Sequence, residues 1–146
     1  MEFNTRVRLS LLAVAENLFQ LITDLPSNIR PDEKERTGIK IFVREVGTRN
    51  LMLGSVGHPS EAAQFFATEK AVRSETLGHF SSQNSEDPGQ MKFAGSVTVS
   101  FRGAKYQASV SGLKAEEDVF IAVSLLASLL NTHASNIVTN VVENHG

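Results

Sequence analysis

The chain has 146 residues, of which 41% are hydrophobic and 21% charged, a composition that excludes disordered, collagen-like and coiled-coil proteins. Its formal net charge is −2, so it lacks the overall positive field that attracts phosphate backbones, and we expect no nucleic-acid partner. The absence of cysteine excludes disulfides, thiolate metal sites and cysteine nucleophiles. The length predicts a single domain over residues 1–146, with a short C-terminal tail from about residue 132.

The first predicted element is an amphipathic helix near the N-terminus. Leu11, Ala15, Leu18 and Ile22 recur at spacings of three and four, the pattern of a helix that packs one face on a core. The segment from Arg6 to Ala15 also resembles a short signal peptide, but the apolar pattern continues beyond the point of cleavage. No apolar run reaches the ~20 residues that a membrane span needs. We therefore expect a core helix, no membrane partner and a cytoplasmic location.

A charged stretch at residues 26–36 is predicted to be an exposed connection, and a strand hairpin follows it. Ile39, Ile41 and Val43 give the alternation of a half-buried strand, and residues 47–50 supply a turn before a second strand begins at Leu51. Ser60 has the character of an N-cap for a second helix over residues 62–77, which would end at the glycine that follows.

The second half of the chain repeats the strand–turn–strand pattern after a polar loop at residues 81–89. Residues 93–101 have a period of two, residues 102–105 form a turn, and residues 106–111 return as a partner strand. Glu116, Glu117 and Asp118 stand in the first turn of a helix that runs to Leu130, because carboxylates stabilise the positive end of a helix. The apolar tail residues 137–142 are compatible with a last helix or with a fifth strand that packs on a neighbouring subunit.

This order of elements predicts an α+β fold. Consecutive strands joined by short turns favour an antiparallel sheet, here of about five strands covered by helices, over a doubly wound parallel sheet. No internal repeat is visible in the sequence.

Common catalytic motifs are missing from the sequence. It contains no G-x-S-x-G, P-loop, dinucleotide-binding or H-E-x-x-H motif, and no two of its four histidines have the spacing that places two metal ligands on one helical face. We therefore assign no catalytic residue and no metal site.

Two histidines are candidate ligands for a cofactor. His58 precedes the predicted second helix and His79 follows it, and a single neutral imidazole suffices as an axial ligand of haem iron. The alternative is that each is an ordinary surface or cap histidine. His133 and His145, near the tail, are weaker candidates.

Two cations of the predicted second helix are candidates for binding an anionic group. Lys70 and Arg73 lie three residues apart and so are neighbours on one helix face. The alternative for Lys70 is a solvated helix lysine. Glu116 and Asp118 are compatible with a carboxylate pair for acid–base chemistry. Their place at a helix N-terminus is a sufficient explanation, because the positive end of the helix dipole stabilises carboxylates.

Two stretches carry a resemblance to a known family. Residues 108–118 read ASVSGLKAEED and are followed by Ile121 and Ala122, while Lys70 and Ala71 form a Lys-Ala element in the second helix. These resemble the strand, Ser-Gly, Glu-x-Asp and Lys-Ala elements of the GlcG/HbpS haem-binding family, which includes the C-terminal domain of PduO-type corrinoid adenosyltransferases. The resemblance implies a profilin-like fold, symmetric oligomers and, in some members, binding or slow oxidative breakdown of haem or interaction with cobalamin.

The leading hypothesis is therefore an oligomeric small-molecule-binding protein whose favoured ligand is haem or a related tetrapyrrole. His58 or His79 would ligate the iron, and Lys70 or Arg73 would pair with a propionate. One alternative is a non-catalytic assembly or adaptor protein without a cofactor, whose last helix and tail, with Ile137 and Val141, form a homo-oligomeric interface. A lesser alternative is an enzyme acting on a small carboxylated metabolite.

Overall fold

The computed structural model describes residues 2–25, 36–61, 63, 67, 69–70 and 95–130. In chain order these residues form two helices and four strands: α1 (Thr5–Thr23), β1 (Gly38–Glu45), β2 (Leu51–Gly57), β3 (Ser96–Phe101), β4 (Ala104–Ser111) and α3 (Ala115–Leu129). The described residues of the predicted second helix, at positions 63, 67, 69 and 70, are helical as well, and so is position 61, one residue before its predicted start. The tail, the loop at 81–89 and the connection at 26–35 lie outside the described residues.

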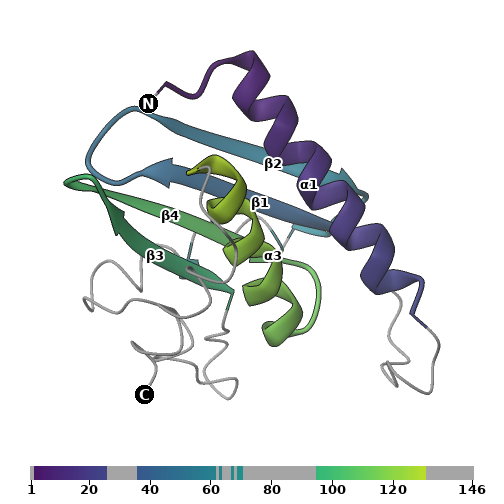
Figure 1. Ribbon diagram of the computed structural model, residues 1–146. Helices are drawn as coiled ribbons and strands as arrows, with labels where there is room; N and C mark the ends of the chain where they lie inside the picture. Colours follow the sequence, from purple (N-terminus) through teal and green to yellow (C-terminus); the bar gives the residue numbers. More distant parts are fainter. Residues whose placement is uncertain are drawn as a thin grey trace.

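The four strands form one antiparallel sheet in the order β2-β1-β4-β3 (Figure 1). The predicted α+β class and antiparallel sheet are confirmed, although the described residues supply four strands where about five were expected. Both hairpin turns lie where the sequence places them. In the β3–β4 turn, Arg102 and Gly103 have φ values of 52° and 82°, the left-handed pair that two-residue hairpins favour.

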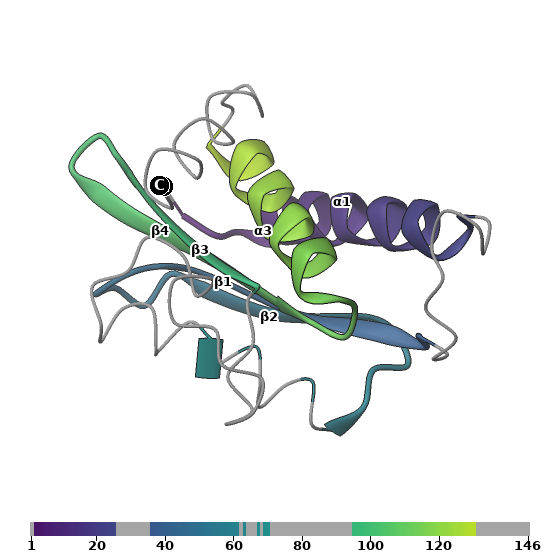
Figure 2. The same ribbon diagram turned by 90° about the horizontal axis from the view of Figure 1, so that it is seen from below.

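Helices α1 and α3 cover one face of the sheet, and helical residues between positions 61 and 70 lie on the other face (Figure 2). The predicted apolar stripe of α1 is confirmed, since Leu11, Ala15 and Ile22 are buried. The helix begins at Asn4, whose side-chain Oδ1 accepts a hydrogen bond from the N–H of Val7 at 3.0 Å. Gly54 of β2 lets α1 come close, because a Cβ atom there would lie 2.7 Å from Leu12 Cδ2.

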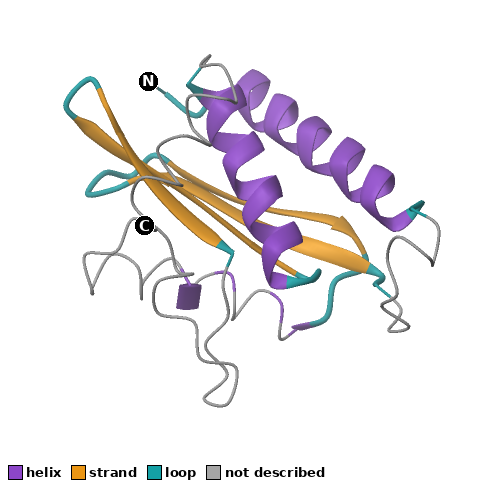
Figure 3. Ribbon diagram, turned by 60° about the horizontal axis from the view of Figure 1, so that its bottom comes forward, coloured by secondary structure: helices purple, strands orange, loops and turns teal. Residues whose placement is uncertain are grey.

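The main core lies between the sheet and these two helices (Figure 3). Alternate strand residues point into it, and α3 adds apolar residues along most of its length, as its continuous hydrophobic run predicts. The strand residues of this core are Ile39, Ile41, Val43, Met52, Val56, Val97, Val99, Tyr106, Ala108 and Val110.

The opposite face of the sheet is polar and yet largely buried. Arg44 Nε donates a hydrogen bond of 2.7 Å to Gln107 Oε1, and Gln107 Nε2 donates one of 3.1 Å to Thr98 Oγ1, so a polar row crosses three strands. Phe42 packs against Ala67 on this face. The prediction that β1 is only half-buried is therefore wrong at Phe42, because residues of the second helix cover the face that was expected to meet solvent.

Candidate functional site

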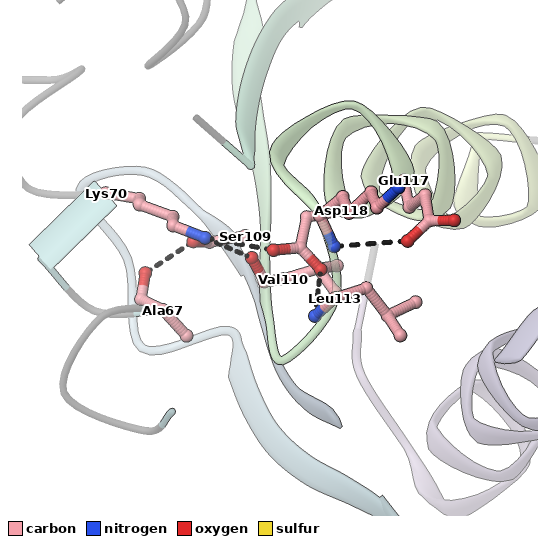
Figure 4. Close-up of polar contacts among 8 residues, drawn as sticks. Ala67, Lys70, Ser109, Val110, Leu113, Glu117 and Asp118 are labelled. Atoms are coloured by element: carbon pink, nitrogen blue, oxygen red, sulfur yellow. Dashed lines mark hydrogen bonds and ion pairs between the residues drawn. The ribbon is translucent and has the colours of Figure 1, made fainter. Parts of the chain in front are cut away.

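Lys70 is the centre of a buried polar cluster at the junction of β4 and α3. Its side chain is 2% exposed. The ammonium donates a hydrogen bond of 2.9 Å to the carbonyl oxygen of Val110 and forms an ion pair of 3.2 Å with Asp118 Oδ2 (Figure 4). Lys70 therefore joins the segment on the polar face of the sheet to the helix on the other face.

Asp118 is held in place by the start of α3. The Leu113 N–H donates to Asp118 Oδ1 at 3.1 Å, so each carboxylate oxygen has its own donor. The next carboxylate acts as a cap, because Glu117 Oε1 accepts a hydrogen bond of 3.1 Å from the N–H of Lys114 at the N-cap. The acidic first turn therefore contains one residue that caps the helix and one that binds a buried cation.

Gly95 closes the niche around the ammonium group. Its carbonyl oxygen accepts a hydrogen bond of 2.9 Å from the Val110 N–H, and its φ of 143° belongs to a region that favours glycine. A Cβ atom at position 95 would lie 2.5 Å from the Val110 carbonyl oxygen and 2.7 Å from Lys70 Nζ. The missing side chain is what makes room for the ion pair.

The described residues of the second helix that face the sheet follow helical spacing. Ala63, Ala67 and Lys70 are all buried, at intervals of four and three residues. Ser109 Oγ donates a hydrogen bond to the carbonyl oxygen of Ala67, next to the Lys70 contacts (Figure 4). This stripe is the sequence signal for a buried Lys70, since it places the lysine on the same face as two small core residues.

Burial controls the acidity of Asp118. Removal from water raises the pKa of its carboxyl, and the Lys70 ammonium, the Leu113 N–H and Arg36 lower it; the balance is a pKa of about 6, above the ordinary value of 3.8. The desolvation of the carboxylate thus outweighs the attraction of its partners, as is common for buried ion pairs.

This pKa makes the stability of the fold depend on pH. Because the folded state holds the Asp118 proton more tightly than the unfolded chain, the group stabilises the fold most below about pH 4, and this contribution falls as the pH rises to about 6. At about 1.4 kcal/mol per pKa unit the decline is roughly 3 kcal/mol. The wild type and Asp118→Asn would be unfolded with denaturant at pH 4 and at pH 7. We expect the free energy of unfolding to fall more between these two pH values in the wild type than in the variant. The same pH dependence in both proteins would contradict the assignment.

His58 lies at the other candidate position, directly after β2. Its backbone is fixed by two hydrogen bonds, from the His58 N–H to the Thr37 carbonyl oxygen at 2.8 Å and from Thr37 Oγ1 to the His58 carbonyl oxygen at 2.7 Å. The side chain is exposed. A rigid strand end therefore presents the imidazole to solvent, where it is accessible to a ligand.

The structure brings together only some of the candidate residues. Lys70 is not the solvated helix lysine of the alternative reading, because its charge is already compensated by Asp118. Glu116 is exposed while Asp118 is buried, so these two carboxylates do not share one environment. His79, Arg73, His133 and His145 lie outside the described residues.

In the part of the chain that the structure describes, no group of three or more histidine or acidic side chains is arranged to hold a metal ion. Within the same residues, no helix has both the length and the apolar character to cross a bilayer.

Comparison with solved structures identifies the same fold elsewhere. The chain is similar to PduOC in a crystal structure of its haem complex, with a TM-score of 0.62 and 13% sequence identity over 88% of this chain and 95% of that one. It is also similar to the Klebsiella pneumoniae protein ORFY, described as DUF336, with a TM-score of 0.60 and 14% identity over 87% and 90% of the two chains. The fold implied by the resemblance is therefore confirmed. No family model and no curated protein matches the sequence.

Proposed function

We propose that this protein binds haem or a related tetrapyrrole. The observation that carries the proposal is the fold that it shares, over 88% of its length, with a domain crystallised with haem. Because one fold hosts many functions, the proposal also needs residues suited to the ligand.

His58 fits the role of an axial ligand. Its imidazole is exposed, and the strand end that carries it is fixed by the two hydrogen bonds with Thr37. A neutral imidazole is the usual protein ligand of haem iron, which would supply the redox chemistry of the bound group. His79 is the second candidate for this position, as the sequence indicates.

Lys70 does not fit the role of a propionate partner. Its ammonium lies against Asp118 and the Val110 carbonyl oxygen, and the niche is closed by Gly95. Arg73 is therefore the residue that we propose for pairing with a ligand carboxylate, because a guanidinium binds carboxylates in a bidentate geometry.

A hemin titration tests this proposal. Hemin would be added to the purified protein and to its His58→Ala, His79→Ala and His145→Ala variants at neutral pH while the Soret band is recorded. We expect a saturable, sharpened band in the wild type that either His58→Ala or His79→Ala loses, because removal of the axial imidazole changes the iron coordination. His145→Ala removes the weaker candidate near the tail, and we expect this variant to behave as the wild type.

Three results would count against the proposal. An unsaturable, broad band in all four proteins would show only nonspecific adsorption of hemin. A saturable band that survives in the double variant His58→Ala/His79→Ala would exclude the imidazole ligation proposed here. An effect of Arg73→Gln equal to that of Ser128→Gln, a change on the exposed side of α3, would exclude the proposed carboxylate contact.

A further inference from the structure

Exposed cations gather at one end of the molecule, although the net charge of the chain is −2. Both hairpin turns lie at this end, side by side, because Val46 N–H donates to the Lys105 carbonyl oxygen at 2.8 Å (Figure 1). The first turns of α1 reach the same end, since Arg8 Nη2 donates to the Leu51 carbonyl oxygen at 3.2 Å. The cations that we call the basic end are Arg6, Arg8, Arg49, Arg102 and Lys105, all exposed.

Few carboxylates offset these charges. Among the described residues of this end, the acidic side chains are Glu2, next to the start of α1, and Glu45, at the end of β1. Glu45 is half-buried and lies beside Tyr106. Burial is the main cause that raises the pKa of Tyr106, and the negative charge of Glu45 raises it further. The basic end therefore has a local positive excess that the net charge of the whole chain conceals.

Exposed leucines lie among these cations. Leu9 follows Arg8 in α1 and is 62% exposed, while Leu51 and Leu53 at the start of β2 are 41% and 49% exposed. Leu51 and Leu53 alternate with the core residues of β2 and so share the face of the sheet away from α1, whereas Leu9 lies on α1 over the other face. Large apolar side chains in water are unremarkable one at a time, but here a pair on one strand face follows directly on the turn that carries an exposed arginine. Cations and apolar side chains together at one end are complementary to an anionic lipid bilayer, which has negative headgroups at its surface and apolar chains below them.

We propose that the basic end docks on a membrane surface rich in anionic lipids, with the arginines on the headgroups and the leucines at the headgroup–acyl boundary. This departs from the expectation of no membrane partner, which rested on the absence of a spanning segment. Docking of this kind needs no spanning helix. A nucleic acid would be bound through cations and stacking aromatic rings. Among the described residues of this end the large exposed apolar side chains are leucines, and the half-buried Phe101 ring is already covered by the Arg102 guanidinium, 5.1 Å from its centre.

Vesicle co-sedimentation tests the proposal. The full chain would be mixed with vesicles of phosphatidylcholine alone and with vesicles of seven parts phosphatidylcholine to three parts phosphatidylserine. We expect binding to the second kind only, weakened by high salt because exposed charges are screened. Arg49→Gln/Arg102→Gln should weaken the binding by more than tenfold, since each cation near such a surface contributes roughly fivefold.

Matched variants separate the basic end from a general effect of charge or hydrophobicity. Asn17→Asp/Ser128→Asp makes the same change in net charge at exposed positions in the middle of α1 and near the end of α3, and it should leave binding within about twofold of the wild type. Leu51→Ser/Leu53→Ser should weaken binding, whereas Leu21→Ser, at a residue that is 61% exposed on α1, should not. Circular dichroism would confirm that each variant is folded.

Other outcomes would overturn the proposal. Equal binding to both kinds of vesicle, or to neither, would exclude recognition of anionic lipid by the basic end. Displacement from the vesicles by a single-stranded RNA, combined with indifference to the leucine substitutions, would assign the basic end to nucleic acid instead.

Discussion

Lys70→Met is expected to destabilise the protein by about 3–5 kcal/mol at pH 7, the usual effect of removing one partner of a buried ion pair. The substitution keeps an unbranched side chain, one atom shorter, but leaves the Asp118 carboxylate, 1% exposed, with the Leu113 N–H and without its cation. For a chain of this size we expect the melting temperature to fall by roughly 10 °C or more. Thermal and denaturant unfolding would measure both quantities.

The cause of this loss can be separated from a packing defect. Lys70 lowers the pKa of Asp118, so its removal raises that pKa further, and the carboxyl of the variant becomes neutral at mildly acidic pH. The deficit of Lys70→Met should therefore shrink between pH 7 and pH 5, and Lys70→Met/Asp118→Leu should recover much of the stability. The control, Lys105→Met at an exposed position, should change stability by less than about 0.5 kcal/mol. A deficit that is independent of pH would instead indicate lost packing.

Gly95→Ala is the second substitution for which a large effect is expected, about 2–6 kcal/mol of lost stability. Strain at a positive φ contributes about 1–3 kcal/mol, and crowding in a packed interior contributes about as much. The new methyl group would meet the Val110 carbonyl oxygen, a backbone atom of a residue that is fixed by pairing with Ile41 of β1 and by its N–H bond to the Gly95 carbonyl oxygen. Denaturant unfolding of the variant measures the sum of these effects.

A second glycine of positive φ provides the control. Gly103, in the β3–β4 turn, has a φ of 82° and no atom within 4 Å of a Cβ at that position. Gly103→Ala should therefore show the strain without the crowding and destabilise the fold by about 1–3 kcal/mol. If the two variants lost the same stability, the niche around Lys70 would not be as tight as described.

The sequence predicted the regular elements well because their apolar periodicity reflects the burial directly. The structure buries the face that each pattern predicts. This holds for the apolar stripe of α1, for the alternation in β3 and β4 and for the apolar run of α3. The order of the strands was not predicted. The two hairpins pair through β1 and β4, but the core-facing residues of all four strands are similar apolar residues, so the sequence does not indicate which strands are neighbours.

The Lys70–Asp118 pair escaped prediction for a different reason. The two residues are 48 positions apart, and each has an adequate local explanation, a solvated lysine in one case and a favourable charge at a helix N-terminus in the other. The role of Gly95 beside the Lys70 ammonium was not predicted either, because a glycine within a strand pattern looks like any other small residue. The resemblance to the GlcG/HbpS family includes the segments that hold Lys70 and Asp118, but only the structure shows that these two segments are in contact.

The strand order also bears on how the chain reaches its fold. The β1–β2 and β3–β4 hairpins are local, and each is marginal in water by itself, whereas the β1–β4 pairing joins Lys40 to Ser111 across 71 positions of chain. Closing that long loop costs entropy before any contact is gained, so the meeting of the two hairpins should limit the folding rate. The same cost grows by only about 0.6 kcal/mol when a loop doubles in length. Added residues in the connection between the hairpins would thus cost little as long as Ala63, Ala67 and Lys70 keep their buried places, whereas the two-residue turn between β3 and β4 has no such freedom.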